Sequence, residues 1–386
     1  MAVRPGGSPE VAVPMRSPAF AAGVRVHRVI EVDPIGDPRW RHLVLSHPDA
    51  TVYHHPAWLE AIQHEYGRPL IGLACEDAAR QLLGILPLMS TRGLPPGGNF
   101  AGRRLSSLPR TPIAGPLAVD EQACATLVRA AVARVEAEPG VQLQLKIAAP
   151  LPSAAAGLVH CRPWRKSYAL DLTGASAVAT NAGARRKNAW AVGKARRSGV
   201  IVRLAEAEAE LRSWYRLYLG TMRGLAVPAR PYRIFQALWQ LLRPAGLMQL
   251  VLAEQRINGR ATLLAGSIFF SFGSTVSYAF SGWGRASHSL RANDLIHAEM
   301  IEAARRAGYR SYDFGEVAGG QQSLAAFKGK WGAQARQLYH VVYPARLDAE
   351  GSGLGSGRLQ GFAASLWRRM PLDLTAAVGD LVYRFL

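Results

Sequence analysis

Cysteine is scarce in this sequence, and its scarcity excludes two classes of structure. Only three cysteines occur among 386 residues, at Cys75, Cys124 and Cys161. Because they are odd in number and far apart, they form neither a disulfide framework nor a metal-binding motif, and a reducing cytoplasm is the expected setting. The sequence also lacks the roughly 18 consecutive apolar residues that a membrane-spanning helix needs. We therefore expect a cytoplasmic protein, either free or peripheral at the inner face of the membrane.

Acidic residues are few relative to basic ones. The sequence has 46 Lys and Arg against 27 Asp and Glu, which gives a formal net charge of +19. A positive field of this size predicts polyanionic partners, namely RNA, a phosphorylated substrate or an anionic membrane surface. An arginine-rich proteome would give the same bias without any ligand. With 49% hydrophobic residues over this length, the chain is predicted to be globular, with two domains and extensions.

The two halves of the chain predict a similar order of elements. In the first half, the hydrophobic pattern predicts a hairpin, a helix and a strand at 70–76, 82–89, 121–138 and 141–147. In the second half, it predicts a basic helix, a strand, two amphipathic helices, three strands, a helix and a strand at 185–198, 200–204, 206–222, 232–242, 248–254, 262–272, 275–283, 292–307 and 309–314. No residue-by-residue repeat relates the halves, so this order is only weak evidence for duplication.

These elements predict the limits of the domains. Residues 1–22 have no sustained apolar region and predict a flexible tail. The first domain is expected at 23–165 and the second at 166–345, with a last strand that either stays there or returns to the first domain. Residues 346–386 contain a Gly/Ser linker and then apolar residues with interspersed arginines. This last segment suits either an interfacial helix pair at a membrane or packing on the body, and packing is favoured.

Two adjacent histidines, His54 and His55, precede a predicted helix whose apolar face contains Trp58, Ile62 and Tyr66. Adjacent residues of an extended segment point in opposite directions, and no third ligand stands nearby, so a metal site is not expected. His54 is retained as a candidate hydrogen-bonding group that faces substrate in a cleft.

We expect the chain to be organised around the strand end Asp313–Glu316 and the short helix that follows it. There, Lys328 lies between Phe327 and Trp331 in sequence. One interpretation makes the two aromatic residues core anchors at i and i+4 and leaves both Lys328 and Lys330 in solvent, which is the commoner outcome for this spacing. The other interpretation holds Lys328 beside the rings, where its fixed charge would stabilise the oxygen of a reacting carbonyl group.

A series of short motifs in a fixed order spans about residues 35–343. They are Tyr53-His54-His55-Pro56-Ala57-Trp58, Gly84-Ile85-Leu86-Pro87-Leu88, Leu105-Ser106-Ser107-Leu108-Pro109, Gly115-Pro116-Leu117, Arg186-Lys187-Asn188, Thr221-Met222-Arg223, Arg291-Ala292-Asn293-Asp294, Asp313-Phe314-Gly315, Phe327-Lys328 and Trp331-Gly332. With these motifs the chain resembles the FemAB family of aminoacyltransferases, in particular its Gram-negative branch beside exopolysaccharide and exosortase loci. The resemblance implies an α/β fold of mixed sheets, with two tandem acetyltransferase-like (GNAT) domains and an inter-domain cleft.

The resemblance also implies a reaction and a set of residues. Members of the family move an amino acid from its transfer RNA onto an amine of a peptidoglycan precursor, without a metal or a bound cofactor. Lys328 then stabilises the tetrahedral intermediate, with Phe327 supporting it, while Tyr278 lies near the acceptor. Arg186 and Arg291 correspond to arginines that hold acceptor phosphates. The sequence has Glu316 where the branch often has arginine or serine, and it lacks the acceptor-binding lysine of the first domain.

The residues themselves leave several roles open. Asp313, Glu316 or a phosphate of the substrate is the candidate proton acceptor. Asn293 either caps its helix or contacts substrate. The loop predicted at 285–291 contains no glycine. Enzymes that use acyl-coenzyme A bind its pyrophosphate with a glycine-rich turn before a helix, so the lack of glycine argues against acyl-coenzyme A as the donor.

We therefore predict an acyltransferase that forms an amide bond on a phosphorylated cell-envelope precursor, peptidoglycan or polysaccharide, with aminoacyl-transfer RNA as donor. Catalysis is assigned to Lys328, Phe327 and Asp313. One alternative is an acyl-coenzyme A-dependent N-acyltransferase that acts on an amino sugar during exopolysaccharide synthesis. Another is a non-catalytic binding protein with the same fold. A peripheral membrane contact through the C-terminal segment is a further expected partner.

Overall fold

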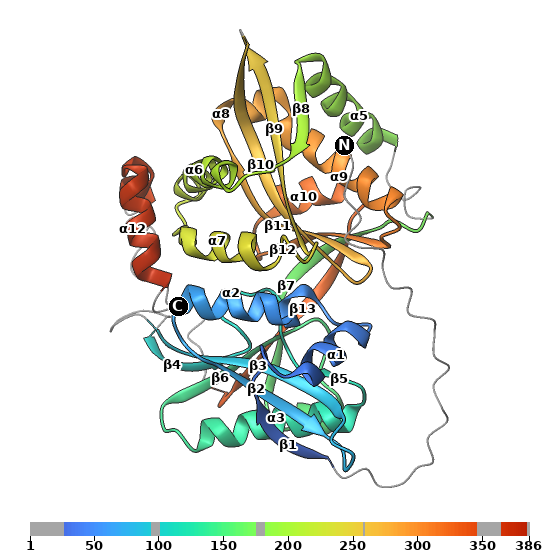
Figure 1. Cartoon of the computed structure of the whole chain (residues 1–386), viewed down its shortest axis with the longest axis vertical. Helices are drawn as coiled ribbons and strands as arrows, with labels where there is room; N and C mark the ends of the chain where they lie inside the picture. Colours follow the sequence, from blue (N-terminus) through green and yellow to red (C-terminus); the bar gives the residue numbers. More distant parts are fainter. Residues whose placement is uncertain (1–26, 94–100, 175–181, 258, 346–363, 384–386) are drawn as a thin grey trace.

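The computed structural model describes residues 27–93, 101–174, 182–257, 259–345 and 364–383. These residues form one mixed sheet of 13 strands, ordered β1-β2-β3-β4-β6-β13-β7-β12-β11-β10-β9-β8, with β5 paired to β3 (Figure 1). The first lobe supplies β1 (Arg28–Val32), β2 (Leu70–Glu76), β3 (Leu82–Gly93), β4 (Ala101–Ser106), β5 (Leu117–Ala118) and β6 (Val141–Ile147). The second lobe supplies β8 (Val200–Leu204), β9 (Met248–Ile257), β10 (Arg260–Phe272), β11 (Thr275–Trp283) and β12 (Ser311–Val317).

Two long strands, β7 (His160–Asp171) and β13 (Gln334–Tyr343), lie between the lobes. The last strand, β13, pairs with β6 of the first lobe along one edge, where Val341 lies opposite Leu145. Along its other edge it pairs with β7, where Ala335 lies opposite Tyr168. The sheet therefore continues from one lobe to the other.

Helices cover both lobes, and the mixed α/β class predicted from the sequence is confirmed. Their bounds are α1 (Pro38–Ser46), η1 (Val52–His54), α2 (Pro56–Tyr66), α3 (Glu121–Glu136), α4 (Ser153–Ala156), α5 (Ala182–Arg197), α6 (Glu208–Gly224), α7 (Tyr232–Leu241), α8 (Arg285–Leu290), α9 (Ala292–Arg306), α10 (Gln322–Gly329) and α12 (Leu372–Tyr383). The sequence signals are visible at α3, where Asp120 accepts a hydrogen bond from the Ala123 N–H and caps the helix.

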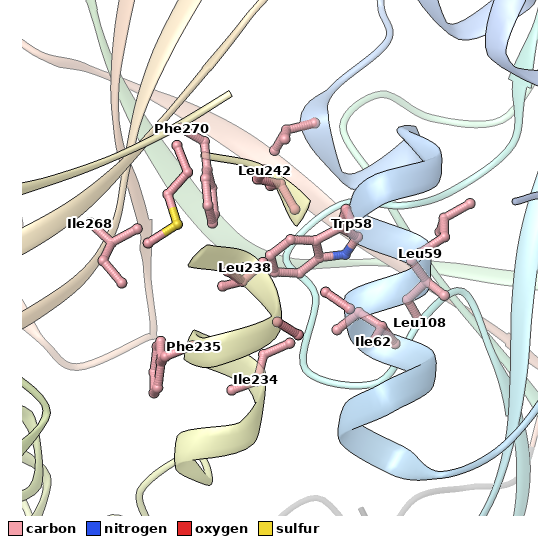
Figure 2. Close-up of a cluster of buried hydrophobic side chains, with 14 of the residues drawn as sticks. Trp58, Leu59, Ile62, Leu108, Ile234, Phe235, Leu238, Leu242, Ile268 and Phe270 are labelled. Carbon is pink, nitrogen blue, oxygen red and sulfur yellow. The ribbon is translucent and has the colours of Figure 1, made fainter. Parts of the chain in front are cut away.

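The lobes are joined by apolar packing between α2 and α7 (Figure 2). Trp58 and Ile62 of α2 face Ile234 and Leu238 of α7, and Phe270 of β10 closes the group. All five side chains are almost completely buried. Since burial of one large apolar side chain contributes about 1.5–3 kcal/mol, this contact fixes the lobes relative to each other.

Two sequence predictions fall on residues outside the described part of the chain, the tail at 1–22 and the Gly/Ser linker at 349–358. The strand predicted at 309–314 is shifted, since β12 covers Ser311–Val317. The reason is local: Gly308 adopts φ +80° and the Tyr309 N–H still bonds to the Ala304 carbonyl at the end of α9. Within the described ranges, no helix has both the length and the apolar character needed to cross a membrane.

Candidate active site

A β-bulge at Asp313–Glu316, hereafter the bulge, shapes the centre of the site. Asp313 lies opposite Ala169 and Glu316 opposite Ser167, so β12 contains one more residue than β7 over this stretch. Gly315 adopts φ +76°. The Asp313 carboxylate accepts hydrogen bonds from the Gly315 N–H at 2.8 Å and the Ser167 hydroxyl at 3.2 Å. Asp313 thereby stabilises the bulge, and burial raises its pKa.

Lys328 binds the bulge from α10. Its side chain is only 3% exposed, and its Nζ donates to the carbonyl oxygens of Gly315 at 2.9 Å and Glu316 at 3.0 Å. The interpretation that placed this lysine in solvent is therefore wrong. An ammonium group has three N–H donors, and these two bonds engage two of them. Burial lowers the pKa of Lys328 to about 8, and the charges of Asp313 and Glu316 partly oppose this shift. Lys328 is therefore mostly protonated at neutral pH.

The aromatic residues beside Lys328 form a ring of contacts around a histidine that the sequence analysis missed. His297 of α9 is buried, and its Nδ1 shares a 2.8 Å hydrogen bond with the Tyr312 hydroxyl. Its ring centroid lies 4.7 Å from that of Tyr278 and 5.5 Å from that of Phe327. Burial lowers the pKa of His297 to about 3, so this ring is neutral. The apolar pattern of α9 gave no signal for it, because a polar residue there breaks the stripe.

Phe327 and Trp331 are half-buried. Trp331 packs against the core of the second lobe, in line with its spacing, whereas Phe327 packs against His297. Lys330 is not solvated either, since its Nζ forms an ion pair with Asp294 at the start of α9 and lies 4.5 Å from the Phe327 ring centroid. The Asn188 amide of α5 donates to the Lys330 carbonyl at 2.9 Å. Helices α5, α9 and α10 are thus tied together next to Lys328.

A cleft of about 320 Å³, hereafter the β7 cleft, lies beside the bulge and is bounded by β7, the loop after β12 and the first turns of α10. Arg165 lies in it, with its guanidinium 4.3 Å from the Trp164 ring centroid, and forms an ion pair with Glu316. The second carboxylate oxygen of Glu316, Oε2, is buried and accepts no hydrogen bond from the described residues. Lys328 Nζ lies 5.9 Å from the ring centroid of Tyr168, which lines the cleft.

A second hollow of about 190 Å³, hereafter the interlobe cavity, lies between the lobes. Its polar lining includes Tyr53 from the first lobe, Ser277 and Asp313 from the second, and Ser167 and Arg336 from the connecting strands. Asp313 of the bulge thus lines the interlobe cavity, and Glu316 of the bulge pairs with Arg165, which lines the β7 cleft.

The structure brings most of the predicted site residues together. Asp313 and Glu316 belong to the bulge, and Lys328 donates hydrogen bonds to it. Tyr278 and Phe327 both pack against the ring of His297. Asn293 and Arg291 lie at the start of α9, where Arg291 is exposed with φ +59° and its guanidinium lies 5.4 Å from the Trp190 ring centroid. The Asn293 Oδ1 is buried without a hydrogen-bond partner among the described residues.

Two predicted residues lie apart from the bulge. Arg186 is exposed on α5. His54 is 3% exposed inside the first lobe, where its Nδ1 accepts from the Thr51 N–H at 3.2 Å and its Nε2 lies 3.2 Å from the Gly115 carbonyl oxygen. Because both ring nitrogens are engaged, His54 serves the packing of the first lobe and does not reach the bulge.

The segment predicted as a loop at 285–291 is different in the structure. Residues Arg285–Leu290 form α8, and Arg291 then links it to α9. A helix engages its backbone N–H groups internally after the first turn. The Asp294 carboxylate, paired with Lys330, also supplies a negative charge to the first turn of α9.

Gly315→Ala is expected to destabilise the fold by about 1–2 kcal/mol, because a side chain at positive φ brings Cβ too close to the backbone carbonyl oxygen. The free energy of unfolding from urea titration measures this effect. Gly319→Ala is the matched control, since Gly319 has no neighbour within 4 Å of an added Cβ and no positive φ. Equal stability of the two variants would show that the bulge does not need glycine.

Comparison with known proteins places this geometry in a class. Residues 182–328, from α5 to Lys328, match the family model described as acetyltransferase (GNAT) domain. The structure is similar to the crystal structure of FemX, with 14% identity, 81% of this chain and 96% of that chain covered, and a TM-score of 0.62. The chain thus has a FemX-like tandem GNAT fold, as the motifs predicted, and is an acyltransferase.

Two further solved structures share the fold. One is the C-terminal domain (DUF2156) of a putative lysylphosphatidylglycerol synthetase from Agrobacterium fabrum, with 13% identity, 88% of this chain and 95% of that chain covered, and a TM-score of 0.53. The other is L-PGS from Bacillus licheniformis, with 11% identity, 88% and 97% covered, and a TM-score of 0.51. No curated protein matches the sequence.

Proposed function

We propose that this acyltransferase is an aminoacyltransferase of the FemAB type, which forms an amide bond on a phosphorylated cell-envelope precursor with aminoacyl-transfer RNA as donor. The observation that supports this proposal most directly is the buried ammonium of Lys328, held on two carbonyl oxygens of the bulge with one N–H left over. A fixed cation with little water around it stabilises negative charge that develops on a carbonyl oxygen in the transition state.

The reaction needs three events at this place. The amine of the acceptor attacks the ester carbonyl carbon, so a C–N bond forms and the carbonyl oxygen becomes negative beside Lys328. Glu316 takes the proton that the attacking nitrogen loses, through the Oε2 atom that has no other partner among the described residues. The intermediate then breaks its ester C–O bond, and the released ribose hydroxyl of the transfer RNA receives the proton. In this proposal Asp313 stabilises the bulge and does not take the proton.

Features around α9 favour a transfer RNA donor over acyl-coenzyme A. Helix α8 stands where a glycine-rich pyrophosphate turn would be needed, and Asp294 already places a carboxylate in the first turn of α9. Nearby, the basic helix α5 presents Trp190, which is 52% exposed, with Lys194 Nζ 5.5 Å from its ring centroid. Cations beside an exposed aromatic ring suit phosphates and a stacked base of single-stranded RNA.

Trp190→Ala is expected to raise KM for aminoacyl-transfer RNA by roughly tenfold, with kcat nearly unchanged, because stacking of a base contributes about 1–3 kcal/mol. Steady-state kinetics with varied donor concentration measures the split. Ile201→Ala, which removes another exposed apolar side chain, is the control. An unchanged KM would remove α5 from the donor site.

The pH dependence of transfer follows from Lys328. Burial lowers its pKa from 10.5 to about 8, so the rate is expected to fall as the pH rises through 8, tenfold per pH unit above it. Stability should change in the opposite direction: between pH 8 and 10.5 the unfolded chain keeps a proton that the folded chain has lost, and stability rises with pH. Burial also lowers the pKa of Lys146, to about 7, so this lysine loses its proton in a similar pH range. The pH profile of Lys328→Met therefore serves as the reference that contains the Lys146 titration alone. A variant profile that keeps the alkaline fall would contradict the assignment.

The donor is tested with purified protein, envelope precursors and either labelled aminoacyl-transfer RNA or labelled acetyl-coenzyme A. We expect the label to move from transfer RNA to a precursor amine. Movement from the coenzyme alone would overturn the donor and leave the acyltransferase class intact. Failure of both labels to move, together with binding of precursor, would favour the non-catalytic alternative. The aminoacyl-transfer RNA donor also implies a cytoplasmic location.

A further inference from the structure

The C-terminal helix α12 packs on the second lobe along one of its faces. Thr375, Gly379 and Tyr383 form its buried face at intervals of four residues. A Cβ added at Gly379 would lie 2.4 Å from the Ala229 carbonyl oxygen, so the helix approaches this backbone closely. Figure 1 shows α12 beside α6 and α7, at the outer edge of the molecule. The sequence prediction that this segment packs on the body describes only one of its faces.

The opposite face of α12 is apolar and open to solvent. Leu374 is 48% and Leu381 57% exposed, and Leu366, in the short helical stretch 364–369 before α12, is 59% exposed. Leu225 and Val227 of the α6–α7 loop belong to the same surface, because the preceding segment is held there: Arg368 Nε donates to the Gly224 carbonyl at 3.2 Å, and Arg223 Nη1 donates to the Met370 carbonyl at 2.9 Å. We name Leu225, Val227, Leu366, Leu374 and Leu381 the C-terminal apolar surface.

This concentration is unusual within the described part of the chain. Five of its ten exposed large hydrophobic side chains lie on the C-terminal apolar surface. The helix packs Tyr383, Leu372 and Ala376 against the core and still presents Leu374 and Leu381 to solvent, so it has apolar residues beyond those its packing uses. An exposed apolar surface of this kind marks an interaction site.

The charges at its rim indicate which partner it fits. Arg368 and Arg369 are exposed beside Leu366, and Asp373 is the exposed acid next to Leu374. The net charge of the chain is +19, which opposes the approach of a second copy and favours a negatively charged surface. Leucines that enter the acyl boundary, with arginines at the level of the phosphates, are the pattern of an interfacial helix.

We propose that the C-terminal apolar surface docks the protein on an anionic lipid bilayer, with α12 lying in the plane of the interface. This inference does not depend on the choice of donor in the proposed function. It gives the enzyme direct access to a lipid-linked or membrane-proximal acceptor while both hollows beside the bulge stay in water.

The test is flotation of the full-length protein with vesicles of phosphatidylglycerol and phosphatidylcholine, compared with phosphatidylcholine alone. We expect binding to the anionic vesicles and at least about tenfold weaker binding of the Leu374→Ser/Leu381→Ser variant, since each leucine contributes its buried area. Arg368→Glu/Arg369→Glu should weaken binding by a similar factor and reduce its salt dependence. Leu45→Ser/Ile201→Ser, which alters exposed apolar residues elsewhere, should bind as the unmodified protein does.

Circular dichroism and transfer to a water-soluble acceptor show whether each variant is folded, since none of these residues lies near the bulge. The proposal would be overturned if the unmodified protein and the leucine variant bound the anionic vesicles equally well. It would also be overturned if the unmodified protein bound both kinds of vesicle equally well. A dimer in solution that the leucine substitutions abolish would assign this surface to a second copy instead, and would also overturn it.

Discussion

Lys328→Met is expected to lower kcat/KM for acyl transfer by about 10²–10³, the loss seen when one donor to an oxyanion is removed. Methionine keeps the length and apolar stem of the side chain but removes the charge and all three donors. Among the described residues of α10, the Lys328 ammonium is the one group that donates hydrogen bonds to the bulge carbonyls. Transfer of labelled amino acid to an excess of acceptor measures the effect.

The matched control for this substitution is Lys166→Met. Lys166 lines the β7 cleft but is exposed, so its replacement changes net charge by the same amount close to the site and should leave kcat within about twofold. Because Lys328→Met also leaves two carbonyl oxygens without their donor, thermal unfolding must show that the variant remains folded. An active Lys328→Met/Phe327→Ala double variant would defeat the site assignment outright.

Glu316→Gln is expected to lower kcat by about 10²–10⁴, the usual contribution of a positioned general base. Glutamine has the same shape and still offers an oxygen to Arg165, but its amide cannot take a proton from the attacking amine. Added formate should restore part of the rate in this variant and none in Lys328→Met, because only the former lacks a base. Rapid-quench transfer assays with and without formate measure both the loss of rate and the fraction of it that formate restores.

Asp313→Asn distinguishes the role of the Asp313 carboxylate from that of Glu316. Asp313 accepts hydrogen bonds that hold the bulge, so its replacement should act mainly on stability, and formate should not rescue any loss of rate. If Asp313→Asn were rescued by formate and Glu316→Gln were not, the proton acceptor would be Asp313, which the sequence analysis assigned to catalysis.

Periodic patterns predicted the architecture well. The alternation in Val141–Ile147 and the apolar stripe of α3 are local signals, and both elements form as expected because each presents one face to the same core. Short motifs in order then predicted the tandem arrangement, which FemX shares. The start of β12 and its bulge were less predictable, because Gly308 and Gly315 adopt positive φ angles there, which a hydrophobic pattern does not contain.

The site was only partly predictable, for a physical reason. Spacing favoured a solvated Lys328, whereas its burial depends on two carbonyl oxygens 12 and 13 residues earlier in the chain, which only the bulge turns toward it. His297 was missed because its neighbours come from β11, β12 and α10. His54 was retained because a histidine beside a predicted cleft suggests binding, but its partners lie in its own turn and at Gly115.

The most direct test is a single-turnover measurement on the Lys328→Met protein, with donor binding and the rate of the chemical step determined separately. If the buried ammonium of Lys328 at the bulge stabilises the negative oxygen, the dissociation constant for aminoacyl-transfer RNA will stay near that of the unmodified enzyme while the chemical step slows by about 10²–10³. A variant that transfers at the original rate, or that loses only its affinity for the donor, would contradict this account.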